Sequence, residues 1–153
     1  MNIWKDTYPL IVSCAKGLAA HTAGELVKLG YHIIEETENT VVVRGNMRDM
    51  MRLNLQLRTA HRVLVPLLRT ECRQLRHLYE DVYSIDWENL LEADGYFTVN
   101  SVVRNETIFD TRMPSLKAKD AIADRMRDRC GGRPDSGRET FGAAVFIYWM
   151  DNE

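Results

Sequence analysis

Arginine and lysine side chains that could bind phosphates are concentrated in two segments of this sequence. The first is LNLQLRTAHRVL, residues 53–64, and the second is SLKAKDAIADRMRDRCGGRP, residues 115–134. Between Arg112 and Arg133, seven basic residues stand against three acidic ones, a local excess in a chain whose net charge is −2. Arginine is favoured at phosphates because its planar fork donates two hydrogen bonds at once. The pattern therefore predicts a local surface that binds a polyanion.

These charges also have a purely structural interpretation, which the sequence leaves open. On an ideal helix the mixed charges of residues 117–128 share one side, as is typical of a solvated face. Lys119 and Arg129 fall beside the apolar stripe of Ala118, Ile122 and Met126. Each either snorkels at the edge of the core or reaches toward a phosphate.

Arg58 and Arg62 bracket the passage from an expected helix to an expected strand. A cation at this place can stabilise the last carbonyls of the helix, pair with an acid between two domains, or contact the polyanion. The sequence favours neither the structural role of Arg58 and Arg62 nor their contact with the polyanion.

Residues typical of catalysis or metal binding form no recognisable pattern. The four histidines and three cysteines are scattered, without HxxxH or CxxC spacing, so we expect no metal site. The glycines of CGGRPDSG, residues 130–137, lack the GxGxxG and Walker spacings and follow an expected helix, which favours a turn. The acidic residues at 35–38 fit a solvated edge. We expect no catalysis within this chain.

Composition bounds the class of protein. The chain has 153 residues, of which 45% are apolar, enough for one compact domain or two small ones. Three unpaired cysteines and the polar start MNIWKDTYP favour a reduced, cytoplasmic protein without a secretory signal. No apolar run approaches the roughly 20 residues that a bilayer span requires.

Apolar periodicity predicts six elements in the first half. Strand-like runs cover residues 9–14, 31–36, 40–44 and 62–68, and Pro66 suits an edge strand or a bulge. One helix follows Gly17 and ends at Gly30. A second covers residues 47–57, with Asn46 as its cap and with Met47, Met51 and Leu55 on one face, which we expect to enter the core. The order β-α-β-β-α-β is the ferredoxin-like pattern.

The second half predicts a smaller α/β unit. A helix over residues 78–85 leads to Trp87 as an anchor, and residues 96–103 form a strand. After a loop, Ser115 caps a helix that runs to about residue 130, where two glycines end it. Residues 142–150 form an apolar last strand. We place the boundary near residue 72, which gives domains 1–72 and 73–153.

Five sequence blocks, in order, carry a resemblance to a known family. They are PLIVSCAKGL (9–18), LNLQLRTAHRVLVPL (53–67), LYEDVYSIDWENLL (78–91), FTVNSVVRN (97–105) and LKAKDAIADRMRDR with GGRP (116–134). The chain resembles the N-terminal region of bacterial THUMP-containing RNA methyltransferases. These are the ribosomal RNA guanine-N2 methylases that are also labelled N6-adenine DNA methylases. In that family a ferredoxin-like segment and a THUMP domain precede a Rossmann-like methyltransferase domain.

The resemblance implies an α/β (α+β) chain, with a ferredoxin-like unit followed by a THUMP-like unit that lacks its last strand. It implies a parent enzyme that methylates guanine N2 of large-subunit ribosomal RNA with S-adenosylmethionine. The cofactor would bind in a methyltransferase domain in cis or in trans, because neither its glycine-rich turn nor an Asn/Asp-Pro-Pro-Tyr/Phe motif occurs here. This chain would capture structured RNA without a cofactor, a metal or a membrane. The residues expected to contact RNA are Arg104, Asn105, Arg112, Lys117, Lys119 and Arg133, followed by Arg58 and Arg62.

Two other functions stay open at this point. A protein-interaction module would expose Met47, Met50 and Met51 to a partner helix, although the core is the favoured place for these methionines. A small enzyme on a ferredoxin-like scaffold would need convergent titratable groups, which the sequence does not show.

Overall fold

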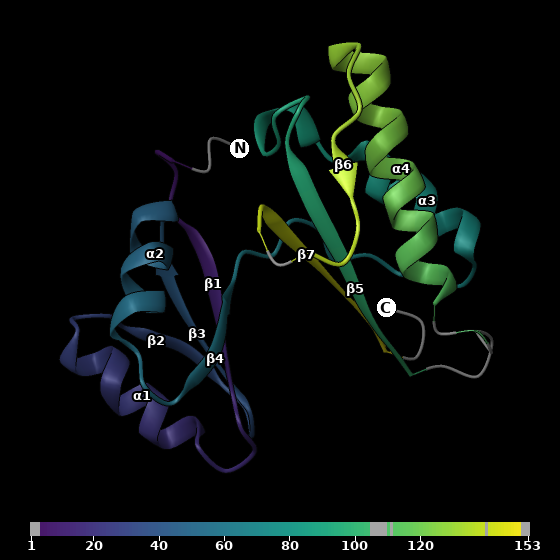
Figure 1. The fold of residues 1–153 in the computed structure, drawn as a ribbon. Coiled ribbons are helices and arrows are strands. Elements are labelled where there is room, and N and C mark those ends of the chain that lie inside the picture. Colours follow the sequence, from purple (N-terminus) through teal and green to yellow (C-terminus); the bar gives the residue numbers. More distant parts are fainter. Residues whose placement is uncertain (1–3, 105–109, 111, 140, 151–153) are drawn as a thin grey trace. The chain divides into compact units, whose positions relative to one another are not determined.

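The computed structural model describes residues 4–104, 110, 112–139 and 141–150. The chain divides into two compact units, Met1–Leu67 and Leu68–Glu153, which are described separately (Figure 1). The division lies upstream of residue 72, because the segment that leads to Cys72 is tied to the second unit. The Cys72 carbonyl oxygen accepts a hydrogen bond from Trp149 Nε1 at 2.9 Å.

The first unit is a four-stranded antiparallel sheet with two helices. Its elements are β1 (Tyr8–Cys14), α1 (Ala19–Lys28), β2 (Ile33–Glu36), β3 (Thr40–Gly45), α2 (Met47–Gln56) and β4 (Ala60–Leu64). The strand order is β2-β3-β1-β4, which is the ferredoxin-like arrangement expected from the sequence. Alternating residues of β1 and β3, such as Leu10, Val12, Val41 and Val43, are fully buried, because successive strand side chains point to opposite faces.

Helix α2 begins as predicted but turns a different face to the core. The Asn46 side chain accepts hydrogen bonds from the Arg48 and Asp49 amides, and Asp49 Oδ2 accepts one from the Asn46 amide. This capping box, together with a 2.8 Å bond from Tyr31 Oη to Asp49, holds the Asn46–Asp49 side inward.

Leu53 follows Asp49 by one turn and is therefore the buried residue of α2, at 0% exposure. Met51 and Leu55 are 49% and 87% exposed. The expectation that the Met47–Met51–Leu55 stripe enters the core is wrong for Met51 and Leu55, whereas Met47 is half-buried.

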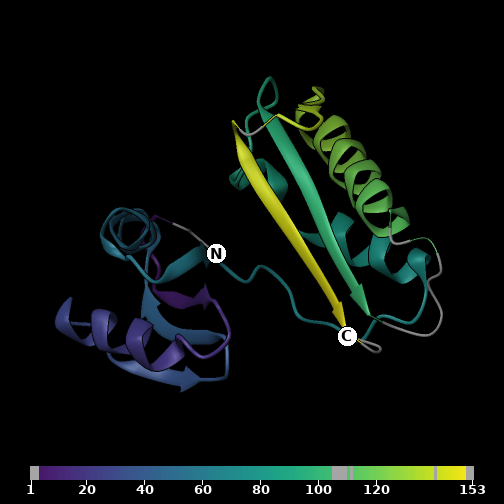
Figure 2. The same cartoon turned by 60° about the horizontal axis from the view of Figure 1, so that its bottom comes forward.

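The second unit combines a three-stranded parallel sheet with two helices. Its elements are α3 (Leu75–Ser84), the short 3₁₀ helix η1 (Trp87–Asn89), β5 (Tyr96–Arg104), α4 (Met113–Cys130), β6 (Asp135–Ser136) and β7 (Ala143–Met150). The strand order is β6-β5-β7, and both pairings are parallel. Figure 2 shows α3 and α4 on one face of the β5–β7 ribbon.

The core of the second unit lies between that face and the helices. Phe97, Trp149 and Met126 are at most 2% exposed. Trp87 anchors the end of α3 as expected, because its Nε1 donates to the Val82 carbonyl at 2.7 Å. None of the described helices is both long and apolar enough to cross a bilayer.

Helix α4 starts earlier than the sequence predicts and ends where it predicts. It begins at Met113 with a proline in its first turn, where a proline's missing amide hydrogen costs no hydrogen bond. Ser115 is therefore not the cap; its hydroxyl donates to the Arg112 carbonyl at 3.1 Å. The helix ends at Gly131, whose φ of 66° is the left-handed conformation favoured for glycine at this place.

Candidate nucleic-acid interface

Four of the predicted contact residues gather at one end of the second unit. Arg104 is the last residue of β5, and Arg112 stands immediately before α4. The two elements run in opposite directions, and the hydroxyls of Ser101 and Ser115 lie 3.1 Å apart. We call this region, with Arg104, Arg112, Lys117 and Lys119, the β5–α4 end.

Arg112 already has an anionic partner. Its Nε and Nη2 donate to the two carboxylate oxygens of Asp110 at 3.0 Å each, and its main-chain amide donates to Oδ1 at 3.0 Å. The Arg112 side chain is the main reason that the pKa of Asp110 lies below its ordinary value. A phosphate must therefore compete with this carboxylate for the Arg112 fork.

Lys117 and Lys119 do not form a pair. A separation of two residues on a helix places side chains about 200° apart, so they lie on opposite flanks of α4. Lys117 shares its side with Asp124, seven residues later, which accepts a 2.8 Å hydrogen bond from Tyr79 Oη on α3. Within the described part of the chain, neither lysine makes a hydrogen bond or an ion pair.

Arg125, one of the seven basic residues of this segment, is unavailable to a ligand because it is buried. Its side chain is 8% exposed and donates to Glu88 at 3.0 and 2.7 Å and to Asp86 at 2.7 Å. The side-chain hydrogen bond from Arg125 is the main cause that lowers the pKa of Glu88. Arg127 also has a carboxylate partner, Asp124, at 2.9 Å. The local charge excess read from the sequence therefore overstates what the surface offers.

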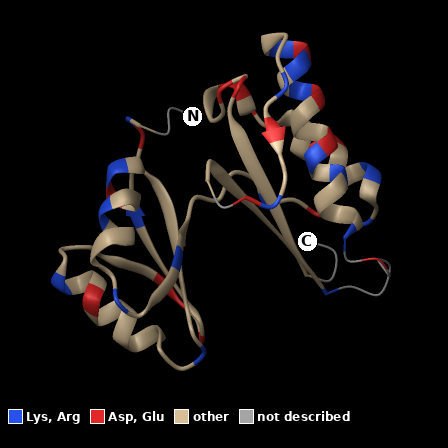
Figure 3. Cartoon of the chain, in the orientation of Figure 1, with Lys and Arg blue, Asp and Glu red and all other residues tan. Residues whose placement is uncertain are grey.

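Arg133 lies far from the β5–α4 end. It lies two residues before β6, which pairs with Tyr96 and Phe97 at the start of β5, whereas Arg104 ends that strand. Eight residue steps at roughly 3.3 Å separate the two ends of β5 by about 26 Å. Figure 3 shows basic residues along α4 and on the loops that flank it, interspersed with acidic ones. Asn105 lies outside the described residues.

Arg58 and Arg62 belong to the first unit. The Arg58 amide donates to Glu25 Oε2 at 2.9 Å, and Thr59 donates to the same oxygen from its amide and its hydroxyl. The Arg58 amide is the main cause of a lowered pKa at Glu25. The Arg58 main chain therefore makes the hydrogen bond to Glu25, and the exposed Arg58 side chain is not needed for it.

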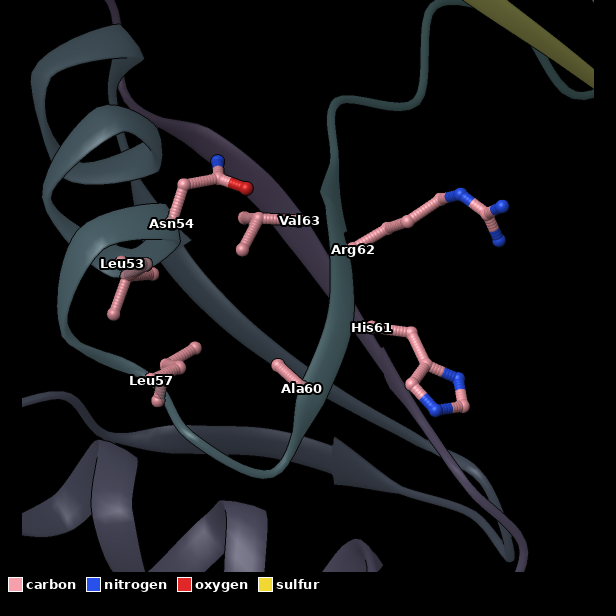
Figure 4. Close-up of a pocket in the computed structure, with 7 residues that line it drawn as sticks. All are labelled: Leu53, Asn54, Leu57, Ala60, His61, Arg62 and Val63. Atoms are coloured by element: carbon pink, nitrogen blue, oxygen red, sulfur yellow. The ribbon is translucent and has the colours of Figure 1, made fainter.

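Arg62 is exposed on β4, an edge strand of the sheet. A shallow pocket beside it is lined by Leu53, Asn54, Leu57, Ala60, His61, Arg62 and Val63. In Figure 4, His61 and Arg62 point away from Leu53 and Leu57. Among the described residues there is also no group of three potential metal ligands.

Two sets of contacts were not anticipated from the sequence. Tyr79 and Tyr83 of α3 donate to Asp124 and Asp128 of α4 at 2.8 and 2.7 Å. The matched four-residue spacing of the two tyrosines and the two aspartates was the available signal. The bond to Asp124 is the main cause that raises the pKa of Tyr79 to about 12.

The second set joins the start of β5 to the loop before β7. The rings of Tyr96 and Phe141 lie 4.4 Å apart, centroid to centroid. The available signal was an aromatic residue, Phe141, placed directly before Gly142 at the start of the expected last strand.

Known families match both units. Residues 9–64 match the RlmL ferredoxin-like domain, and residues 72–139 match the THUMP domain. The fold and these matches agree, so the chain consists of an RlmL-type ferredoxin-like domain followed by a THUMP domain. It corresponds to the N-terminal region of the ribosomal RNA large subunit methyltransferases K/L and of related methylases.

Two curated relatives illustrate this correspondence. The chain is 39% identical over 131 residues to the ribosomal RNA large subunit methyltransferase K/L of Pseudomonas entomophila, a match that covers 84% of the chain. It is 33% identical over 132 residues to the enzyme of the same name from Magnetococcus marinus, with 86% covered. The aligned part spans 18% of the length of each relative.

Solved structures share the fold. A predicted N6-adenine-specific DNA methylase from Listeria monocytogenes superimposes with a TM-score of 0.81 at 25% identity, over 96% of this chain and 38% of that one. SMU.472, solved in complex with SAH, gives 0.81 at 24% identity over 97% of this chain and 40% of its own. The latter likeness is one of fold alone.

Proposed function

We propose that this chain is the RNA-capturing region of a ribosomal RNA methyltransferase. The observation that carries the proposal is the THUMP match over residues 72–139 in a unit whose β5–α4 end presents Arg104, Lys117 and Lys119 without carboxylate partners among the described residues. Phosphate contacts of this kind fix the register of a nucleic acid without reading its sequence.

The chemistry of the parent enzyme is part of the same proposal. The relatives are named for methylation of large-subunit ribosomal RNA, and one structure of this fold is a complex with SAH. S-adenosylmethionine and a guanine N2 acceptor would therefore meet in a methyltransferase domain outside these residues. This division of labour is physically sensible, because an enzyme that modifies a base must hold the strand while the base enters a pocket.

Fluorescence anisotropy with a structured ribosomal RNA fragment, at several salt concentrations, tests the proposal. Three phosphate contacts predict a log–log salt slope of about −2 to −3. The double variant Lys117→Glu, Lys119→Glu should weaken binding and flatten the slope. The control variant Lys16→Glu, Lys28→Glu makes the same charge change on the first unit and should bind as the wild type does. Absence of binding at low salt would contradict RNA capture.

A protein partner is the alternative, which the exposure of Met51 and Leu55 on α2 favours. Such a contact would be apolar and therefore insensitive to salt. Binding to the methyltransferase domain that persists in high salt and is lost in Leu55→Lys, in a chain without RNA affinity, would support this alternative over RNA capture.

A further inference from the structure

An aromatic pair, the half-buried Tyr96 and the exposed Phe141, stands at the end of the second unit opposite to the β5–α4 end. Tyr96 is the first residue of β5, and Phe141 precedes β7 by two residues. Their ring centroids lie 4.4 Å apart with the planes inclined by 32°. Phe141 is nevertheless 62% exposed. Tyr96 thus covers one side of the Phe141 ring and leaves the rest of it open to solvent.

The loop before β7 is fitted closely to Tyr96. The Glu139 amide donates to Tyr96 Oη at 3.0 Å. A Cβ on Gly137 would lie 2.5 Å from the same oxygen, and a Cβ on Gly142 would collide with the Tyr96 carbonyl. Gly142 also has a φ of 79°, which L side chains rarely adopt. Two glycines and one hydrogen bond therefore hold the loop that presents Phe141.

The charges around this pair do not favour phosphates. The exposed cations near it, Arg133 and Arg138, are matched by Asp135 and Glu139, and the exposed Asp94 stands two residues before Tyr96. Such a neighbourhood gives little attraction for a run of phosphates. The exposed ring of Phe141 is therefore the group best suited to bind RNA at this end, because every nucleobase has a π face that can stack on a ring.

We propose that the open face of Phe141 stacks an unpaired base of the captured RNA. The inference rests on the proposed function and specifies it, because bases inside a duplex do not offer a face to a side chain. Tyr96 supports the ring from behind, and Arg138, three residues earlier in the same loop, is exposed. The β5–α4 end then supplies an ionic contact, while Phe141 supplies one that depends little on salt.

Two RNAs and three substitutions of Phe141 test this inference in the full chain. The RNAs are one hairpin with a short single-stranded tail that carries 2-aminopurine, and the same hairpin with a blunt end. Phe141→Ala should weaken binding of the tailed RNA by roughly 5- to 150-fold and leave the blunt RNA and the salt slope unchanged. Phe141→Leu, which keeps apolar bulk without a π face, should behave similarly, and Phe141→Trp should retain affinity.

The matched control is Tyr148→Ala, which removes an aromatic residue of similar exposure, 47%, from β7. It should bind both RNAs as the wild type does. Quenching of 2-aminopurine by the wild type, but not by Phe141→Leu, would support stacking directly. Circular dichroism establishes that each variant is folded.

The outcomes separate the two proposals. Equal affinity of Phe141→Ala and wild type for the tailed RNA would overturn base stacking and leave RNA capture intact. An equal loss for tailed and blunt RNA would also overturn it, because the effect would not require an unpaired base. If the wild-type chain binds neither RNA, both RNA capture and base stacking are contradicted.

Discussion

The Arg125 guanidinium meets the Glu88 carboxylate edge to edge, with Nε 3.0 Å from Oε2 and Nη2 2.7 Å from Oε1. This pair joins α4 to η1, and Nη2 also reaches Asp86 at 2.7 Å. A basic residue in the middle of the candidate RNA-binding helix therefore serves the fold. Because Arg125 is engaged in these contacts, only the other basic residues of α4 can bind a ligand.

Replacement of Arg125 by Leu should destabilise the second unit by about 2–4 kcal/mol, because Glu88 would keep a partly buried charge without its partner. Urea denaturation followed by tryptophan fluorescence measures this change, since Trp87 and Trp149 both lie in that unit. Arg127→Leu, which breaks the exposed pair with Asp124, should cost less than about 1 kcal/mol. Equal costs for the two variants would show that burial adds nothing to the Arg125 contacts.

Removal of the Asp110 charge should strengthen RNA binding. In Asp110→Asn the Arg112 fork loses its ionic partner and becomes available to a phosphate, so the salt slope should steepen by about 1. The double variant Asp110→Asn, Arg112→Ala should lose this added steepness. Anisotropy titrations at several salt concentrations measure both effects. An unchanged slope in Asp110→Asn would place Arg112 outside the RNA contact.

The Tyr79–Asp124 bond should show a measurable coupling between α3 and α4. A hydrogen bond of this kind predicts a coupling of about 0.5–1.5 kcal/mol in a double-mutant cycle of Tyr79→Phe and Asp124→Ala. Urea denaturation of the four proteins provides the cycle. Because Asp124 also pairs with Arg127, the cycle is best repeated in Arg127→Leu. Strict additivity in both backgrounds would mean that the bond contributes nothing.

Glu25 should make the first unit more stable at neutral than at acidic pH. Its pKa is lowered in the folded chain, chiefly by the Arg58 amide. A lowered pKa stabilises the fold above the unfolded-state pKa of roughly 4.3, and the contribution disappears as pH falls through the folded-state value. Glu25→Gln should therefore lower the unfolding free energy at pH 7, by less than about 1 kcal/mol for a half-buried group at the surface.

Urea unfolding of wild type and Glu25→Gln between pH 3 and pH 7 checks the sign. The difference between the two proteins should shrink below about pH 4. A difference that grows toward acid would mean that Glu25 is bound in its protonated form.

The sequence predicted the ferredoxin-like order and the family well, because strand alternation, Asn46 and the helix-ending glycines are local signals. It misjudged the rotation of α2, since an apolar stripe of Met51 and Leu55 carries no information on which side a capping box will turn inward. The start of α4 was missed for a similar reason: Ser115 is a good cap by type, but a proline one residue earlier fits the first turn better.

The candidate site was harder to predict than the fold. Counting charges between Arg112 and Arg133 could not separate buried Arg125 from Lys117, which is unpaired among the described residues, because the partners of Arg125, Asp86 and Glu88, are distant in sequence. Nor could it show that Arg104 and Arg133 stand at opposite ends of one strand. Tertiary contacts decide both questions, and these contacts cannot be inferred from a single sequence.

The parallel pairing of β5 with β7 also bears on the order in which the two units are completed during synthesis. The first unit has all its strands once Leu64 has been made. The second holds β5 without a partner on one side until residues 143–150 emerge, and its Trp149–Cys72 bond joins residues 77 positions apart. Closing so long a segment is entropically costly and slow. On the ribosome, a finished ferredoxin-like domain therefore precedes a THUMP domain that waits for its last described strand.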